Sequence, residues 1–227
     1  SGRYDLGGMA EGWALRAAIG TGFRAPSLYE IAYNNGPFAY PPASSAPLLE
    51  EESEGWEVAV LGAVGSLDIE LIWFDQDIDN EIIFDLAAYS GYMQTQGTSH
   101  SKGIEMVASL PLSERWLIEG NFTTLDATQQ NGRDRAYRPE QTGRASVVFS
   151  SADWRARLTA RYTGEAVDPF LTSIDDTLTI DLTAQWQVSK QWTLEARLLN
   201  LTDHTDQQLP GYNMPGMTAY AGVRMKL

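Results

Sequence analysis

Apolar and polar residues alternate with a period of two along almost the whole chain, and this alternation predicts β-strands. About ten alternating sets can be traced, whereas no segment shows a convincing helical period. The sets span Trp13–Ile19, Trp56–Val60, Leu67–Trp73, Ile104–Leu110, Trp116–Phe122, Ala145–Phe149, Trp154–Tyr162, Leu178–Trp186, Trp192–Leu198 and Ala219–Leu227. We therefore expect an all-β fold.

The connections between these sets alternate in length. Short ones are Gly65–Ser66, Pro111–Arg115, Ser151–Asp153 and Ser189–Gln191. Long ones are Arg24–Ser53, Gln76–Ser101, Ala127–Glu140, Gly164–Asp176 and Thr202–Gly216. Short turns at one end and long loops at the other are typical of an antiparallel transmembrane β-barrel of the bacterial outer membrane.

The tryptophans strengthen this interpretation. All seven lie on the apolar stripes and close to stripe ends. We expect one girdle at the short-turn, periplasmic end, formed by Trp13, Trp116, Trp154, Trp186 and Trp192, with Trp56 and Trp73 at the opposite end. Two aromatic girdles around an apolar band are what a lipid-facing wall requires. A soluble β-sandwich is the alternative, but its tryptophans would favour the middles of strands.

The positions between the apolar residues carry many charges, which would be costly in a dry core. We expect them to face a water-filled lumen, where Glu119 can pair with Arg144 and Asp181 with Arg157. The chain has 16 basic and 30 acidic residues, and its net charge of −14 argues against nucleic acid as a partner. The absence of cysteine excludes disulfides and thiolate metal sites, and two histidines leave little for a histidine metal cluster.

Five segments, in order along the chain, resemble TonB-dependent outer-membrane receptors. They are Gly20–Leu28, which contains Gly-Phe-Arg-Ala-Pro-Ser, then Ala46–Glu57, Lys102–Glu105, Asn200–Asp203 and Tyr220–Leu227. The second segment lacks the family's Asn and second Pro, and the chain ends in Leu rather than the usual Phe. The resemblance implies that residues 1–227 are the C-terminal portion, about ten strands, of a 22-stranded barrel whose plug domain and earlier strands lie outside this chain.

The same resemblance implies the activity and the partners. It implies TonB-dependent active uptake of a scarce metal chelate, a ferric siderophore or cobalamin, across the outer membrane of a Gram-negative bacterium. The implied partners are the remaining barrel strands and the plug domain (in the same protein or a second chain), TonB through the missing N-terminal part, the chelate, and outer-membrane lipid and lipopolysaccharide. No cofactor is implied. The strand from Trp13 to Phe23 and the C-terminal strand are both expected to pair with strands outside the chain.

The resemblance also places ligand recognition in the long loops and the upper lumen wall. Aromatic faces together with amide groups suit a bulky, partly apolar chelate. The loop residues of these types are Tyr29, Tyr33, Asn34, Asn35, Phe38, Tyr40, Tyr89, Tyr92, Gln94, Phe170, Tyr212 and Asn213. Packing of the loops on one another is the alternative role for about half of them. The segment from Ser27 to Ala46 contains no His, which disfavours haem as the ligand.

Two other functions fit parts of the pattern. A ten-stranded outer-membrane protease would use acidic residues with a rim histidine, and His100 could partner Asp75 or Asp77. A passive porin or adhesion barrel would need no such site. Asp75, Asp77 and Asp79 superficially resemble a calcium loop, but the sixth position lacks Gly and the twelfth lacks Glu, so we expect no metal site there.

Overall fold

A single antiparallel sheet of eleven strands dominates the computed structural model, which describes residues 1–8, 11–94, 97–205 and 211–226. The strands are β1 (Gly2–Asp5), β2 (Ala14–Arg24), β3 (Glu51–Val64), β4 (Leu67–Asp79), β7 (Thr98–Pro111), β8 (Trp116–Thr128), β9 (Gln141–Ser150), β10 (Trp154–Thr163), β13 (Thr177–Gln187), β14 (Trp192–Leu199) and β15 (Thr218–Met225). Each strand pairs with the next one along the chain in this series, so the sheet is a meander.

The remaining elements lie in the long loops. They are the hairpins β5 (Ile82–Phe84) with β6 (Tyr92–Gln94) and β11 (Ala166–Val167) with β12 (Ser173–Ile174), the helix α1 (Leu28–Asn34) and the 3₁₀ helix η2 (Ala43–Ser45). In the described ranges, neither helix is long and apolar enough to cross a membrane.

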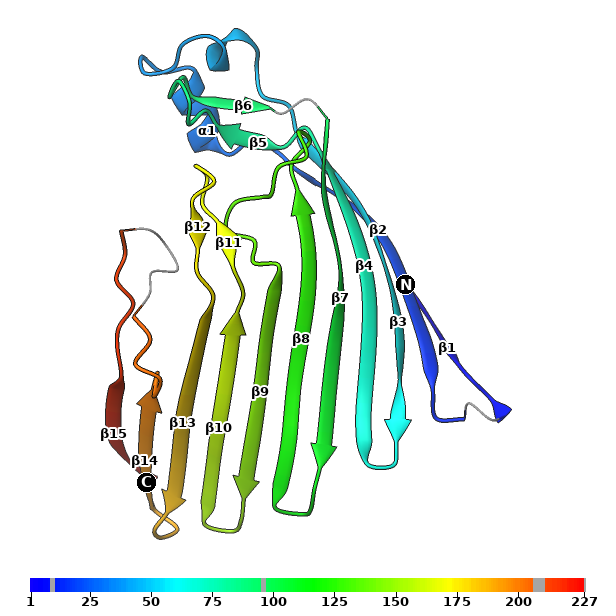
Figure 1. Cartoon of the computed structure of the whole chain (residues 1–227), viewed down its shortest axis with the longest axis vertical. Coiled ribbons are helices and arrows are strands. Elements are labelled where there is room, and N and C mark those ends of the chain that lie inside the picture. The colour runs from blue at the N-terminus through cyan, green and yellow to red at the C-terminus, as the bar shows by residue number, and fades with distance from the viewer. Residues whose placement is uncertain (9–10, 95–96, 206–210, 227) are drawn as a thin grey trace.

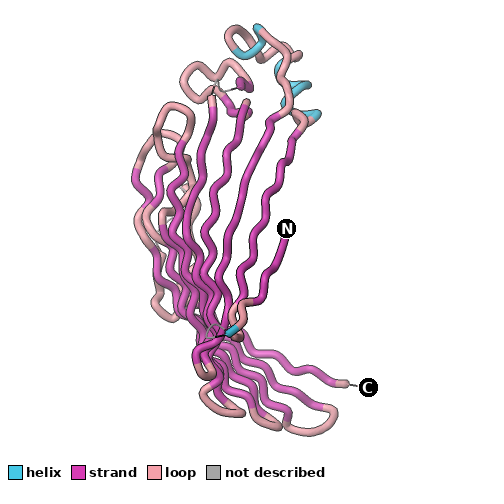
Figure 2. Tube along the Cα trace, turned by 90° about the vertical axis from the view of Figure 1, so that its right-hand side faces the viewer, coloured by secondary structure: helices cyan, strands magenta, loops and turns pink. Residues whose placement is uncertain are grey.

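The sheet forms a curved wall with two unlike ends. In Figure 1 the short turns lie together at the bottom, and the long loops with α1, β5 and β6 lie at the top. Figure 2 shows that both edges of the wall lie on the same side, so that the wall partly encloses a space. This is the shape of part of a barrel, as the alternating loop lengths predict.

One face of the wall is apolar and exposed. Ile19 is 72% exposed and Val223 65% exposed, because no described residue of the chain covers them. At the short-turn end, Trp154 and Trp186 are direct cross-strand partners whose rings stack 5.2 Å apart and within 7° of parallel. Trp13 lies over Gly62, where a side chain would collide with the indole. An apolar surface edged by aromatic rings matches the lipid-facing wall predicted from the sequence.

The opposite face carries the charged residues, and ion pairs connect its strands, some of them across an intervening strand. Arg16 Nη2 lies 2.7 Å from Glu70 Oε1, and Arg224 pairs with Glu195. The two specific pairings expected from the sequence are wrong: Glu119 pairs with Arg157, and Asp181 pairs with Arg161. The strand register explains the difference, because it sets Arg144 opposite Asn121 and sets Glu119 opposite the small Ser146, past which a long arginine side chain can reach.

The N-terminal edge also differs from the expectation. We expected the strand that follows Trp13 to be an open edge of the sheet, but β1 pairs with its first residues, Ala14–Ala17 of β2. The segment Gly2–Asp5 was missed because its four residues show no apolar alternation. The upper part of β2, residues 18–24, has no partner on that side within the part of the chain that the structure describes.

The two faces can be tested with one pair of substitutions. Ile180 shares its face with Trp186, whereas Thr123 lies opposite Glu105 on the lumen side. Ile180→Arg is expected to lower the free energy of unfolding in lipid vesicles by about 2–4 kcal/mol, because it places a charge in the hydrocarbon. Thr123→Arg should change it far less, since its guanidinium faces water and a carboxylate. Equal losses in urea titrations of the two variants would contradict the assignment of the faces.

Candidate functional site

The loop between β2 and β3 begins with a well-capped helix. The Ser27 hydroxyl accepts a hydrogen bond from the Glu30 N–H (3.2 Å), and the Ser27 N–H donates to Glu30 Oε2 (2.6 Å). This reciprocal arrangement is a capping box, which satisfies two of the free N–H groups at a helix N-terminus. It fixes the direction in which α1 leaves the end of β2.

Arg24, the last residue of β2, ties this helix to the next strand. Its Nε and Nη2 donate to the two carboxylate oxygens of Glu51 at 2.5 and 2.8 Å, and its Nη1 lies 3.2 Å from both oxygens of Glu30. Glu51 Oε1 also accepts from the N–H of Ile82, the first residue of β5. One guanidinium and two carboxylates thus connect β2, α1, β3 and β5, and we name Arg24, Glu30 and Glu51 the rim clamp.

The charges of the rim clamp shift one another's pKa values. Burial alone would raise the pKa of Glu51, but the hydrogen bonds from Arg24 and the Ile82 N–H outweigh it and lower this pKa. The pKa of Glu30 is also lowered, because hydrogen bonds from Ser27 and Arg24 outweigh its burial. The hydrogen bond with Glu51 raises the pKa of Arg24. All three groups are therefore charged at neutral pH.

Two amide side chains attach the β5–β6 hairpin to the β2–β3 loop. Asn34 Nδ2 donates to the Tyr92 carbonyl (2.7 Å), and Asn34 Oδ1 accepts from the Tyr92 N–H (2.9 Å). Gln94 makes the same double contact with the main chain of Leu49, at 2.8 Å for each bond. Each amide pairs with main-chain groups as a neighbouring strand would, so these two residues hold the loops together.

Aromatic rings fill the space between α1 and the hairpin. The Tyr33 ring meets Phe84 and Tyr92 edge to face, with centroids 5.7 Å apart in both pairs, and Phe84 lies 5.2 Å from Tyr92. Tyr29 and Tyr89 extend this cluster on either side. Burial raises the pKa of Tyr92. Aromatic contacts of this geometry stabilise the packing of α1 against the hairpin beyond the effect of burying apolar area.

A second arginine joins the β8–β9 loop to the same assembly. Arg135 forms an ion pair with Glu81 and donates to Ser101 Oγ (3.2 Å), while Ser99 Oγ donates to Glu81 Oε2 (2.6 Å). Both partners of the ion pair are largely buried, at 14% and 16% side-chain exposure. Three long loops are therefore linked into one body, the loop cluster, comprising residues 25–50, 80–94 and 129–140. In Figures 1 and 2 its helices lie above the wall, displaced toward the enclosed space.

Of the twelve loop residues singled out for ligand recognition, Tyr29 and Tyr89 flank the aromatic cluster. The other ten, which we expect to contact the ligand, separate into three groups. Tyr33, Asn34, Tyr92 and Gln94 are half-buried and hold the loop cluster together, and Tyr40 donates to the Ala88 carbonyl while remaining exposed. Asn35 and Phe38 belong to the same cluster and are exposed, Phe38 at 74%. Phe170 lies in the β11–β12 turn, and Tyr212 and Asn213 lie between β14 and β15, so the structure does not place these three in the loop cluster.

Sequence reasoning did not assign roles to Arg24, Glu51, Glu81, Arg135 and Phe84. The pattern Ser27-x-x-Glu30 was the available signal for α1, since it is the sequence form of a capping box. No comparable signal identified the two arginine clamps, because their partners are distant in sequence.

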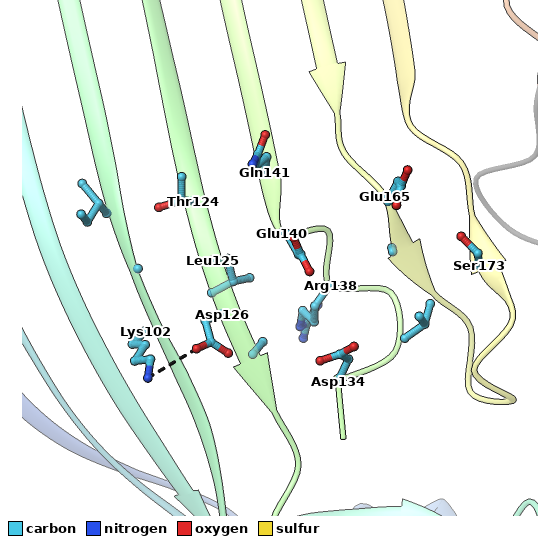
Figure 3. Close-up of a pocket in the computed structure, with 15 residues that line it drawn as sticks. Lys102, Thr124, Leu125, Asp126, Asp134, Arg138, Glu140, Gln141, Glu165 and Ser173 are labelled. Carbon is cyan, nitrogen blue, oxygen red and sulfur yellow. Dashed lines mark ion pairs between the residues drawn. The ribbon is translucent and has the colours of Figure 1, made fainter. Parts of the chain in front are cut away.

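A cavity of about 670 Å³ is lined by the upper ends of β7 and β8, the β8–β9 loop of the loop cluster and the β11–β12 hairpin. In Figure 3 the ion pair of Lys102 with Asp126 (3.4 Å) borders one side, and Asp134, Arg138 and Glu165 border the other. Lys102 and Asp126 are cross-strand partners on the same face as Trp73. The charged strand residues that line the cavity, Lys102 and Asp126, therefore lie on the outer face of the wall and not in the lumen.

The histidine and the acidic residues of the protease alternative also lie on that outer face. His100 Nδ1 is 2.6 Å from Asp77 Oδ1, and both side chains are about half exposed. Asp77 stands on the same side of β4 as Trp73, four residues away, so the pair faces away from the lumen. In the described ranges, no three His, Cys, Asp or Glu side chains are arranged to hold a metal ion.

Comparison with known proteins gives a consistent result. Residues 2–201 match the family described as TonB dependent receptor-like, beta-barrel. The vitamin B12 transporter BtuB of Photobacterium profundum is 24% identical over 222 residues, which cover 93% of this chain and 35% of that protein. BtuB of Vibrio vulnificus is 23% identical over 230 residues, 97% of this chain and 35% of that protein. The chain therefore spans about a third of the length of the curated relatives it matches.

Solved structures show the same fold. The copper transporter OprC superposes with a TM-score of 0.77 at 14% identity, covering 98% of this chain and 38% of that one. The ferripyoverdine receptor of Pseudomonas aeruginosa gives a TM-score of 0.75 at 17% identity, covering 98% and 32%. The ferric enterobactin receptor PfeA of the same species gives 0.76 at 19% identity, covering 96% and 38%. At these identities the likeness shows the fold alone.

The rim clamp predicts how the loop cluster responds to acid. Because the pKa values of Glu30 and Glu51 are lowered from their usual 4.5, their stabilising contribution is complete above that pH and is lost as the pH falls through the lowered values. Hydrogen-exchange protection of residues 25–50 should therefore be constant down to about pH 4.5 and decrease below it. Glu51→Gln should reduce the protection already at neutral pH. Glu52→Gln, on the opposite face of β3, is the control, and equal protection in both variants would refute the clamp.

Proposed function

The chain belongs to the TonB-dependent receptor family, and we propose that it is the C-terminal part of a receptor that imports a scarce metal chelate, cobalamin or a ferric siderophore. Members of this family lie in the outer membrane of Gram-negative bacteria, and this wall is part of such a barrel. The observation that carries the proposal is the loop cluster, an aromatic and amide-rich body fixed above the wall by the rim clamp and by the largely buried ion pair of Arg135 with Glu81.

The loop cluster has the composition that a bulky, partly apolar ligand requires. Phe38, Tyr29 and Tyr89 expose 74%, 65% and 58% of their surface, and the rings behind them hold two of the three in place. Rigid aromatic faces bind a large ligand at little cost in conformational entropy. We assign direct ligand contact to Asn35, Phe38, Tyr40, Phe170, Tyr212 and Asn213, and a supporting role to Tyr33, Asn34, Tyr92 and Gln94.

The complete receptor would contain further parts. In this proposal the remaining strands of a 22-stranded barrel pair with β1 and β15, a plug domain occupies the lumen, and TonB acts through the N-terminal region. Lipid and lipopolysaccharide cover the outer face. No catalytic step is proposed, since His100 and Asp77 face away from the lumen where a chelate would pass.

Growth on single nutrient sources tests this function. A strain lacking the complete gene should fail to grow on cobalamin or on one ferric siderophore, and the gene should restore growth only when TonB is present. Unchanged growth of the deletion strain on every source would reject the proposal. Restoration without TonB would instead support a passive porin.

A second test separates ligand contacts from loop packing. Phe38→Ala removes an exposed ring and should weaken chelate binding by about 1 kcal/mol, roughly fivefold in Kd, while the loops keep their protease resistance. Asn34→Ala should make the loops protease-sensitive, because it removes both hydrogen bonds to Tyr92. Equilibrium binding and limited proteolysis of the purified receptor measure the two effects. Wild-type affinity in Phe38→Ala would remove this residue from the site.

A further inference from the structure

Two hollows follow one another along the same strands on the outer face of the wall. The upper cavity is the one of about 670 Å³ beside Lys102, and the lower groove, of about 460 Å³, lies nearer the short turns. On β7, Lys102 and Ile104 line the upper cavity, and Met106 and Ala108 line the lower groove. These four residues alternate in step along β7 and therefore share one face. Strands β8 and β9 contribute to both hollows in the same order.

The lower groove is apolar, and small residues form its floor. Four cross-strand neighbours on successive strands lack a large side chain: Ala108, Gly120, Ala145 and Ala160. On β8, the bulky side chains of Phe122 and Ile118 stand on either side of Gly120 and border the floor. A groove of this kind in a lipid-facing wall can hold a hydrocarbon chain.

The upper cavity carries charges of both signs. Two cations and four carboxylates line it, with a net charge of 2 − 4 = −2, from Lys102, Arg138, Asp126, Asp134, Glu140 and Glu165. Lys102 and Asp126 form an ion pair, whereas the other four side chains have no hydrogen bond or ion pair within the described part of the chain. Figure 3 shows Arg138 with Asp134 and Glu140 beside it. A ligand that carries both a positive and a negative group would find partners for both here.

The upper cavity lies at the depth where hydrocarbon gives way to lipid headgroups. Its lowest row contains Ile104 and Thr124, which are in register with Trp73, and tryptophan favours the membrane–water interface. The lower groove starts one row closer to the short turns, within the apolar band. A molecule that fills both hollows therefore places its charges at the interface and its chain in hydrocarbon, as a membrane lipid does.

We infer that the upper cavity and the lower groove together bind one phospholipid with a phosphoethanolamine headgroup. The phosphate accepts hydrogen bonds from Arg138 and Lys102, and one acyl chain lies in the lower groove. The ammonium group donates to the unpaired carboxylates of Asp134, Glu140 and Glu165. The site is specific, in contrast to the lipid that covers the rest of the outer face, and it is independent of the imported ligand.

Charge complementarity selects this headgroup over the anionic ones. A lipid with only negative charge meets a cavity whose net charge is already −2, and it has no ammonium group for the carboxylates. The same holds for lipopolysaccharide whose lipid A carries unmodified phosphates. Phosphoethanolamine brings one charge of each sign, so that both kinds of side chain in the cavity are paired.

The test measures which lipid the complete receptor retains. The purified receptor is equilibrated with equal amounts of phosphatidylethanolamine and phosphatidylglycerol that have the same acyl chains, and bound lipid is counted by native mass spectrometry. We expect one retained phosphatidylethanolamine, preferred about tenfold over phosphatidylglycerol. Arg138→Gln should lower its retention about tenfold. Arg133→Gln removes the same charge from the same loop outside the cavity and should change nothing.

Two further variants separate the headgroup from the chain. Glu165→Gln changes only an exposed side chain at the cavity and should reduce the preference for phosphatidylethanolamine over phosphatidylglycerol. Ala145→Phe fills the floor of the lower groove without changing any charge and should lower the retention of both lipids. Ala17→Phe, an exposed position on the outer face of β2 away from both hollows, is its control.

Three results would overturn the inference. Equal retention of the two phospholipids by the unmodified receptor would show that the headgroup is not recognised. Stronger retention of purified lipopolysaccharide than of phosphatidylethanolamine would assign the two hollows to lipid A. Unchanged retention in both Arg138→Gln and Ala145→Phe would place the bound lipid elsewhere on the wall. Retention requires neither chelate nor TonB, so the growth tests report the proposed import separately.

Discussion

Main-chain hydrogen bonding in a medium without water is the constraint on which this structure depends. In hydrocarbon every N–H and C=O must find its partner within the protein. The chain meets this demand by pairing each long strand with its neighbours in sequence, from β1 to β15, so that continuous ladders run across the wall. The short turns follow from the same demand, since they return the chain to the adjacent ladder with few unpaired groups. At the long-loop end, in water, the chain departs from this pattern.

The alternation of side chains along each strand then determines which face of the wall each residue occupies. Because successive residues of a strand point to opposite faces, one face collects Trp, Leu and Val, and the other collects Arg and Glu. The apolar face needs no protein cover, as lipid provides it. The charged face is stabilised locally by pairs such as Arg16 with Glu70, which reach from β2 across β3 to β4 in a watery lumen. The same two-residue period thus produces a lipid interface and a polar interior from one layer of sheet.

The period also explains what the sequence could and could not predict. Strand faces and the tryptophan girdle followed from spacing alone, because both depend on position within one strand. The partners of Glu119 and Asp181 did not, because they depend on the stagger between strands, which the turns determine. Helix α1 was missed because seven residues are too few to show a helical period. Composition predicted ligand contact for Tyr33 and Asn34 and left loop packing as the alternative, and the structure shows that both contact another loop.

The linkage of the loops has a consequence for how such a receptor changes during evolution. Glu51, at the end of the β2–β3 loop, holds the Ile82 N–H of the next loop, and Arg135 of one loop pairs with Glu81 of another. Replacing a single loop with that of a relative would leave a charged group buried without its counter-ion. Recombination is therefore expected to preserve the three loops as one inherited block, with variation concentrated at exposed positions such as Phe38. New ligand preferences would then arise by substitution at the surface of the block rather than by exchange of its parts.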